Sequence, residues 1–193
     1  MSGDGAGEGS RAAIRTVAVI GAGRVGRSFA LACAAAGFDV VLEDVMPANL
    51  RRAQEEYVDL ATQKAGARGR LAVAATVEDA VREADVAVDF VPDELESKLE
   101  IFCMVDRMAP PKTILLTPSE AQSITDLASC TYRAERCFAM RGGFGLEGPV
   151  RLLHPVGAAK AALRAVGDFL RVLGCEVRVE TDTDAPMLIK NLN

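Results

Sequence analysis

Apolar runs and segments of helical pattern alternate along most of this 193-residue chain. The apolar runs are short and rich in β-branched residues, and the segments between them repeat apolar positions at helical spacing. The pattern predicts strands at residues 16–20, 40–42, 71–75, 86–90, 113–116, 137–140 and 176–180. It predicts helices at residues 24–36, 48–64, 77–83, 94–108, 124–129 and 158–173. Strands separated by helices of this length indicate βαβ units, so we expect the α/β class with a doubly wound, mostly parallel sheet.

The composition excludes several classes of protein. Half of the residues are hydrophobic and a quarter are charged, as in ordinary globular domains. The formal net charge of −5 argues against a nucleic-acid partner. No run approaches the roughly 18 apolar residues that span a membrane, and no signal-peptide pattern is visible, so we expect no membrane partner and a cytoplasmic location. Five cysteines without a CxxC pair and a single histidine argue against a metal site.

A glycine-rich turn, Gly21-Ala22-Gly23-Arg24-Val25-Gly26, lies between the first predicted strand and the first predicted helix. Its first glycine permits a tight turn, its second lets a pyrophosphate approach the backbone, and its third lets the helix pack on the strand. The pyrophosphate would rest on the amide groups of the helix N-terminus, where Arg24 and Val25 lie. The alternatives are a glycine turn that binds no dinucleotide and an Arg24 that is only solvated.

Asp44 follows the second predicted strand, 18 residues after Gly26. A carboxylate at this place accepts hydrogen bonds from the adenosine ribose and repels a 2′-phosphate. The glycine turn and Asp44 together predict a Rossmann-type domain that binds NAD in preference to NADP.

With these features the chain resembles the NAD-binding domain of the 3-hydroxyacyl-CoA dehydrogenase family. The resemblance extends from about Arg15 to Asn191 and is carried by VAVIGAGRVG, VVLED, ADVAVDFVPDELESK, PKTILLTPSEAQSIT, YRAERCFAM, FLRVLGCEVRVETD and PMLIKN. It implies oxidation of 3-hydroxyacyl-CoA to 3-oxoacyl-CoA in fatty acid metabolism, with an acyl-CoA-like small molecule as partner beside the dinucleotide.

The expected domain organisation follows from the glycine pattern and the resemblance. Alternating glycines near the N-terminus predict a flexible tail over residues 1–10. Residues 11–185 are expected to form the NAD-binding Rossmann domain, and residues 186–193 to begin the family's helical second domain, which is otherwise absent. Apolar surface left exposed near residues 186–193 would favour self-association, for example as a homodimer.

The resemblance carries the family's cofactor residues over in part. Its dinucleotide motif is matched by the glycines of the turn and by Asp44. In VPDELESK, Asp93 stands where the family usually has a glutamate, and Lys98 where it has a lysine, both beside the nicotinamide. The alternative is that this segment is only a charged helix N-terminus, with its acids placed well for the helix dipole.

The family's catalytic residues are mostly replaced. Glu120, in TPSEA, stands in the place of its serine, and Arg141 in the place of its histidine, with the family's spacing of 21 residues retained. Its glutamate, which orients that histidine, falls near Leu153 or His154. Its last asparagine is matched by Asn191. The candidate catalytic residues are therefore Glu120, Arg141, His154 and Asn191.

These replacements change the chemistry that the site can perform. Arg141 stays protonated and cannot take the hydroxyl proton, and Glu120 could do so only if its pKa were raised by burial. The two side chains are instead expected to pair in a salt bridge. His154 could lie at the strand edge near the cofactor, although a structural role is the alternative. We predict that the chain alone does not oxidise 3-hydroxyacyl-CoA at a useful rate. It is then either a dehydrogenase of altered substrate or a non-catalytic NAD(H)-binding module or partner subunit.

Overall fold

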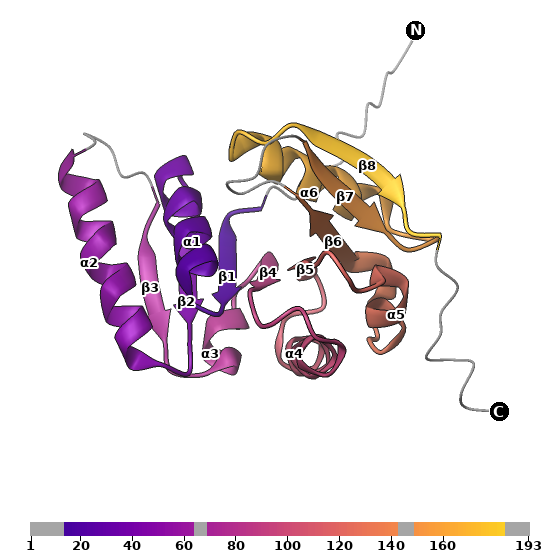
Figure 1. The fold of residues 1–193 in the computed structure, drawn as a ribbon, viewed down its shortest axis with the longest axis horizontal. Coiled ribbons are helices and arrows are strands. Elements are labelled where there is room, and N and C mark those ends of the chain that lie inside the picture. Colours follow the sequence, from indigo (N-terminus) through magenta and orange to yellow (C-terminus); the bar gives the residue numbers. More distant parts are fainter. Residues whose placement is uncertain (1–13, 64–68, 143–148, 184–193) are drawn as a thin grey trace, which may run out of the picture.

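Eight strands form one sheet in the described residues 14–63, 69–142 and 149–183 of the computed structural model (Figure 1). They are β1 (Thr16–Ile20), β2 (Asp39–Glu43), β3 (Leu71–Ala74), β4 (Val86–Asp89), β5 (Ile114–Pro118), β6 (Cys137–Arg141), β7 (Val150–His154) and β8 (Val177–Thr181). Their order is β3-β2-β1-β4-β5-β6-β7-β8, and neighbouring strands are parallel except for β6 and β7. The predicted mostly parallel α/β sheet is confirmed.

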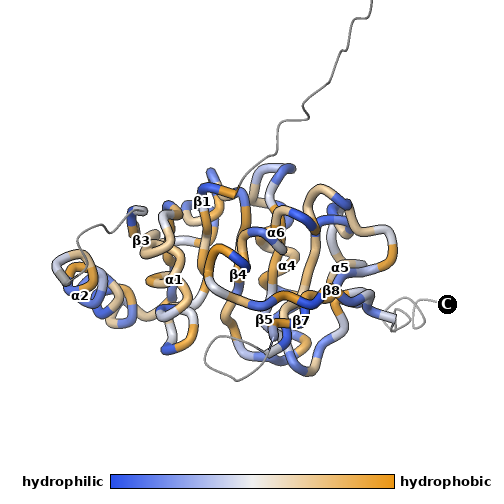
Figure 2. The backbone as a smooth tube through the Cα atoms, turned by 90° about the horizontal axis from the view of Figure 1, so that it is seen from above, coloured by the Kyte–Doolittle hydropathy of each residue, from blue (hydrophilic) through white to orange (hydrophobic). Residues whose placement is uncertain are grey.

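Helices cover both faces of the sheet. They are α1 (Arg24–Ala36), α2 (Pro47–Gln63), α3 (Val77–Val81), α4 (Leu95–Met108), α5 (Ile124–Ser129) and α6 (Lys160–Val172), with a short 3₁₀ turn, η1, at Ala134–Arg136. One buried cluster joins α1, α2 and α6 to the sheet, and a second joins α3, α4 and α5 to its other face. Figure 2 shows hydrophilic and hydrophobic positions alternating along α2.

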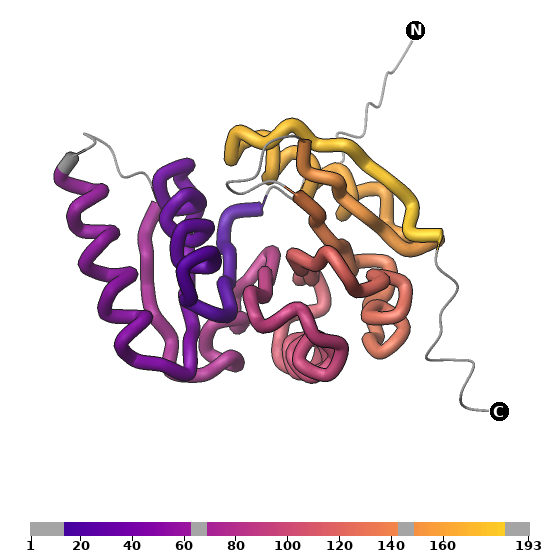
Figure 3. Tube along the Cα trace, viewed as in Figure 1, coloured from indigo at the N-terminus to yellow at the C-terminus, as the bar shows by residue number. Residues whose placement is uncertain are grey.

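The order of the strands creates a switch point between β1 and β4. From β1 the chain moves outward to β2 and β3 through α1 and α2, and then returns to the other side of β1 through α3 (Figure 3). The loops after β1 and β4 therefore leave the sheet in opposite directions. Doubly wound sheets bind their ligands at this point, outside the carboxyl ends of the strands.

β7 was not predicted from the sequence, and the strand direction reverses there, because β7 runs antiparallel to β6 and β8 runs parallel to β7. Arg151 interrupts the apolar run of this strand, so the pattern there resembles a loop after the glycines. In the structure Arg141 of β6 lies directly opposite Arg151, and Ala139 lies opposite Leu153. Because β7 runs backwards, its first residues lie at the carboxyl edge of the parallel strands and its last residues lie at the opposite edge.

Some expectations fall outside the described residues. These are the flexible tail at 1–10, the start of a second domain at 186–193 and the candidate residue Asn191. Among the residues that are described, no helix is long and apolar enough to cross a membrane.

Candidate functional site

Two glycines of the turn are required by packing within the protein. Gly21 has φ of +98°, and a Cβ atom there would lie 3.1 Å from the backbone of Phe90. A Cβ atom on Gly26 would lie 2.0 Å from the carbonyl oxygen of Gly21, so the first turn of α1 packs directly on the end of β1. Neither position tolerates a side chain without a shift of the backbone.

Gly23 differs from both. Its φ of −57° suits any residue, and a Cβ atom there would meet nothing within 4 Å. The protein itself therefore does not require glycine at this position, and the space above it is open. The next residues, Arg24 and Val25, are exposed in the first turn of α1, whose amide groups have no carbonyl partner within the helix. An anion such as a pyrophosphate fits this arrangement.

The turn is held in place by charged side chains on both sides. Asp44 follows β2 and accepts hydrogen bonds from the amides of Ala22 at 2.6 Å and Met46 at 2.7 Å, and from the Asn49 side chain at 3.2 Å. A carboxylate has about four acceptor positions, so one is left for a ribose hydroxyl. The structure thus places Asp44 beside the glycine turn, as the motif predicts.

Arg27 is a further support of the turn that sequence reasoning missed. Its buried guanidinium forms a 2.9 Å ion pair with Glu56 of α2 and donates to the carbonyl oxygen of Ala22 at 3.3 Å. The only signal in the sequence is an arginine within an alanine-rich helix, which is not enough to identify a role.

Lys98 lies inside the protein rather than at the cofactor surface. Its side chain is 1% exposed, and its ammonium group forms a 2.7 Å ion pair with Asp89 and donates to the carbonyl oxygen of Pro118 at 3.0 Å. The pair joins α4 to the carboxyl ends of β4 and β5. Burial raises the pKa of Asp89, an effect that the charge of Lys98 opposes. Contact between Lys98 and the cofactor, which the sequence led us to expect, does not fit this placement.

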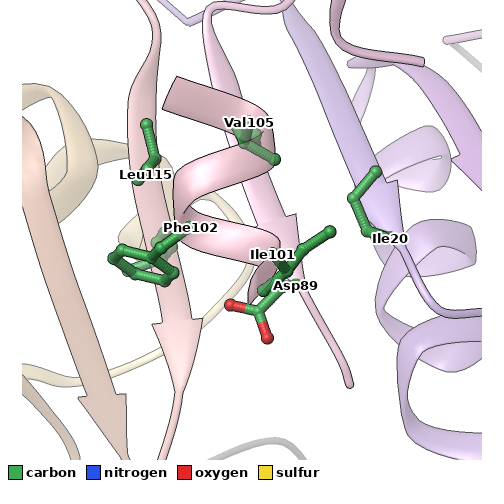
Figure 4. Close-up of a pocket in the computed structure, with 8 residues that line it drawn as sticks. Ile20, Asp89, Ile101, Phe102, Val105 and Leu115 are labelled. Carbon is green, nitrogen blue, oxygen red and sulfur yellow. The ribbon is translucent and has the colours of Figure 1, made fainter. Parts of the chain in front are cut away.

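A small cavity lies between α4 and the sheet, with Asp89 in its lining (Figure 4). Its volume is about 10 Å³, and Asp89 lines it together with apolar side chains that include Ile20, Ile101 and Phe102. That volume holds about one water molecule, so the cavity is not a substrate site.

Asp93 organises the loop that follows β5. Its carboxylate accepts hydrogen bonds from the Ser119 hydroxyl at 2.5 Å and from the amides of Glu120 and Ala121 at 2.9 and 3.2 Å. Burial alone would raise the pKa of Asp93, but these hydrogen bonds outweigh it and hold that pKa below its ordinary value. Asp93 is therefore an ionised positioning group and a poor proton acceptor.

Glu120 and Arg141 lie side by side but do not form the predicted salt bridge. Arg141 donates from Nε to the carbonyl oxygen of Ser119 at 3.1 Å and from a terminal nitrogen to that of Gln122 at 2.9 Å. The Glu120 carboxylate accepts from the amide of Gly142 at 2.7 Å. Each of the two side chains is thus hydrogen-bonded to backbone groups and not to the other side chain. This arrangement fixes the loop of residues 119–122 against the end of β6.

His154 is not near this cluster. It ends β7 at the opposite edge of the sheet, where its Nδ1 lies 2.9 Å from the carbonyl oxygen of Pro155 and its Nε2 lies 3.3 Å from the Thr181 hydroxyl. The expectation that His154 lies at a strand edge near the cofactor does not fit this placement, because β7 runs antiparallel to β6, which the sequence did not predict. Leu153, which is buried, shares a sheet face with Arg141.

The comparisons with known proteins decide the family. Residues 16–141, more than half of the chain, match the family model for the NAD-binding domain of 3-hydroxyacyl-CoA dehydrogenase. The chain belongs to this family. NAD is accordingly the cofactor of this NAD-binding domain, and the open space at Gly23 and the carboxylate of Asp44 fit it.

Individual relatives extend the match beyond residue 141. A 3-hydroxybutyryl-CoA dehydrogenase of Bradyrhizobium diazoefficiens is 30% identical over 187 residues, which cover 90% of this chain and 64% of the relative. The 5-formyl-3-hydroxy-2-methylpyridine 4-carboxylate 5-dehydrogenase of Mesorhizobium japonicum is 26% identical over 190 residues, which cover 92% of this chain and 60% of the relative. The chain spans less than two thirds of the length of these two curated relatives.

A solved structure confirms the fold. The (S)-3-hydroxybutyryl-CoA dehydrogenase from Ralstonia eutropha superimposes with a TM-score of 0.77 at 23% sequence identity, covering 93% of this chain and 68% of its own. At this identity the likeness shows only that this chain shares the Rossmann-type fold.

Proposed function

We propose that this chain is an NAD(H)-binding module of the 3-hydroxyacyl-CoA dehydrogenase type that does not itself oxidise 3-hydroxyacyl-CoA thioesters. The observation that carries the proposal is the charge and hydrogen bonding of three side chains near the carboxyl ends of β4, β5 and β6. Arg141 has no basic lone pair to offer, and the carboxylates of Asp93 and Glu120 already accept hydrogen bonds from the backbone.

The proposed position of the cofactor follows the edge of the sheet. The pyrophosphate would lie over Gly23 against the amides of Arg24 to Gly26, with the adenosine ribose at Asp44 on the β2 side. The nicotinamide would then lie toward the ends of β4 and β5, beside the loop of residues 119–122. Bound NAD supplies a hydride acceptor there, while this chain supplies the anion-binding turn and the ribose acceptor.

Hydride transfer from an alcohol also needs a group that removes the hydroxyl proton. A histidine is suited to this near neutral pH, and His154 lies at the wrong edge of the sheet. Glu120 is exposed and within hydrogen-bond distance of the Gly142 amide, so it is the remaining candidate among the described residues of this cluster. Loss of a general base lowers a rate by about 10²- to 10⁴-fold.

A dehydrogenase of altered substrate is the second candidate function. Its support is the variety among the relatives, of which one is named for 3-hydroxybutyryl-CoA and another for a pyridine carboxylate. The family fold thus accommodates substrates of unlike chemistry, and Glu120 would be the base. A cytoplasmic location and a homodimer stay predictions from the sequence.

An assay of NADH production separates the two functions. With NAD and (S)-3-hydroxybutyryl-CoA, we expect the unmutated chain to produce NADH no faster than the Glu120→Gln variant, because no positioned base is present. His154→Ala is the matched control, since this side chain lies at the far edge, and it is expected to change nothing. NADH production that is lost in Glu120→Gln would identify a carboxylate base and establish the dehydrogenase instead.

A further inference from the structure

The guanidinium of Arg141 is rigidly held at the carboxyl end of β6. Its two hydrogen bonds run to the backbone carbonyls of Ser119 and Gln122, on either side of a tight loop. That loop is itself fixed, because the Ser119 hydroxyl donates to Asp93 and accepts from the amide of Gln122 at 2.9 Å. The side chain is half-buried and already fixed, so binding of a ligand would cost little further side-chain entropy.

The hydrogen-bond partners of Arg141 among the described residues are two neutral carbonyl oxygens, so its charge is not neutralised by either of them. No carboxylate of the described residues lies within ion-pair distance of it, although three are nearby. Glu120 binds the Gly142 amide, Asp93 binds the loop amides, and Glu180 binds Arg151 with two oxygens. A guanidinium has five N–H donors, and two of them bind acceptors in the part of the chain that the structure describes.

The neighbouring arginines show the contrast. Arg151 lies directly opposite Arg141 on β7, and Arg178 lies next to Arg151 on β8. Arg151 is paired with Glu180 at 2.6 Å and Arg178 with Glu176 at 3.3 Å. Three arginines thus occupy one row across β6, β7 and β8. Within the described ranges, Arg141, which is nearest the switch point, is the member of this row that forms no ion pair.

We propose that Arg141 is the receptor for a small carboxylate ligand that binds beside the nicotinamide. This inference rests on the proposed function for the position of the dinucleotide. A ligand carboxylate would receive the unused N–H donors of Arg141, in the charge-assisted geometry that guanidinium and carboxylate groups favour. The ligand class is therefore a free carboxylic acid rather than a thioester.

Acyl-CoA is the less suitable ligand for this guanidinium. The thioester group next to the reacting carbon is uncharged, and the phosphates of coenzyme A stand at the far end of a long pantetheine arm. Such a ligand places no negative charge beside the guanidinium. A carboxylate on a short chain can form an ion pair with it directly.

Three probes that share one 3-oxobutanoyl group test the proposal, namely acetoacetate, ethyl acetoacetate and acetoacetyl-CoA. Each is titrated calorimetrically into the chain saturated with NAD, a combination in which both reactants are oxidised and no turnover occurs. Acetoacetate is expected to bind, and the uncharged ester to bind about 10- to 100-fold more weakly, the range of a charged hydrogen bond. Equal binding of acid and ester, or no binding of acetoacetate, would overturn the proposal.

Variants identify the group responsible. Arg141→Gln is expected to lower the affinity for acetoacetate by about 10- to 100-fold and to leave the affinity for NAD unchanged. Arg141→Lys is expected to restore part of the lost acetoacetate affinity. Arg178→Gln is the matched control, because that arginine lies in the same row, pairs with Glu176 and leaves the pair of Arg151 with Glu180 in place, and it is expected to change the acetoacetate affinity less than about twofold. An equal loss in both variants contradicts the assignment, and so does binding of acetoacetyl-CoA that depends on Arg141.

The failure of the proposed function would be seen separately. NAD affinity is measured first, and a chain that does not bind NAD refutes the dinucleotide module. Acetoacetate is then titrated into the chain alone, where the same dependence on Arg141 is expected, and its absence overturns the carboxylate receptor.

Discussion

Replacing Gly23 with valine is expected to abolish NADH binding while leaving the protein folded. A Cβ atom at this position meets no protein atom within 4 Å, so the side chain enters only the space proposed for the pyrophosphate. We expect the affinity to fall at least about 100-fold, equivalent to about 2.7 kcal/mol. The free energy of unfolding should change by no more than about 1 kcal/mol, the size of effect seen at a helix N-cap. Calorimetric titration with NADH and urea unfolding measure the two quantities.

Gly26→Ala is the informative comparison, because its methyl group would lie 2.0 Å from the carbonyl oxygen of Gly21. This variant is expected to lose NADH affinity and also about 1–3 kcal/mol of stability, as overpacked positions do. If Gly23→Val binds NADH as tightly as the unmutated chain, the pyrophosphate does not lie over this turn.

Replacing Lys98 with methionine is expected to destabilise the fold strongly. The side chains of Lys98 and Asp89 are 1% and 5% exposed, and methionine would fill the space but leave Asp89 as a buried, unpaired carboxylate. Breaking such a pair costs about 3–5 kcal/mol. Urea unfolding of the variant measures the loss.

The double variant Lys98→Met with Asp89→Leu provides the control. Replacing a whole buried ion pair by apolar residues is often neutral or stabilising, so most of the lost stability should return. A single Lys98→Met variant that unfolds within about 1 kcal/mol of the unmutated chain would mean that the ion pair does not join β4, α4 and β5 as described.

Local patterns in the sequence were sufficient to predict most of the fold. The strand at Thr16–Ile20 and the helix at Ile124–Ser129 have the predicted bounds, because each is marked by its own residues and ends at a clear boundary. β7 could not be found in this way. Arg151, its second residue, is exposed, and a charged residue at that position looks in the sequence like part of a loop.

The candidate site was predictable where its contacts are local in the chain or belong to a known motif. The glycine turn and Asp44 are of this kind. Asp93 binds the amide of Glu120 across 27 positions of sequence, and nothing in either segment indicates that contact. A lysine is almost never fully buried unless it is paired. The burial of Lys98 therefore depends on its ion pair with Asp89, and the sequence does not indicate that contact.

The position of the dinucleotide is tested most directly by titrating the unmutated chain with NADH and, in parallel, with NADPH. The chain has no tryptophan, so the fluorescence of the bound nucleotide is free of that background. We predict saturable binding of NADH and binding of NADPH at least about tenfold weaker, a difference of about 1.4 kcal/mol, because the carboxylate of Asp44 repels a 2′-phosphate. In Asp44→Asn, which keeps an oxygen for the Ala22 amide but loses the charge, that difference should shrink. Equal affinity of the unmutated chain for NADH and NADPH, or no saturable binding of either, would contradict the proposed site.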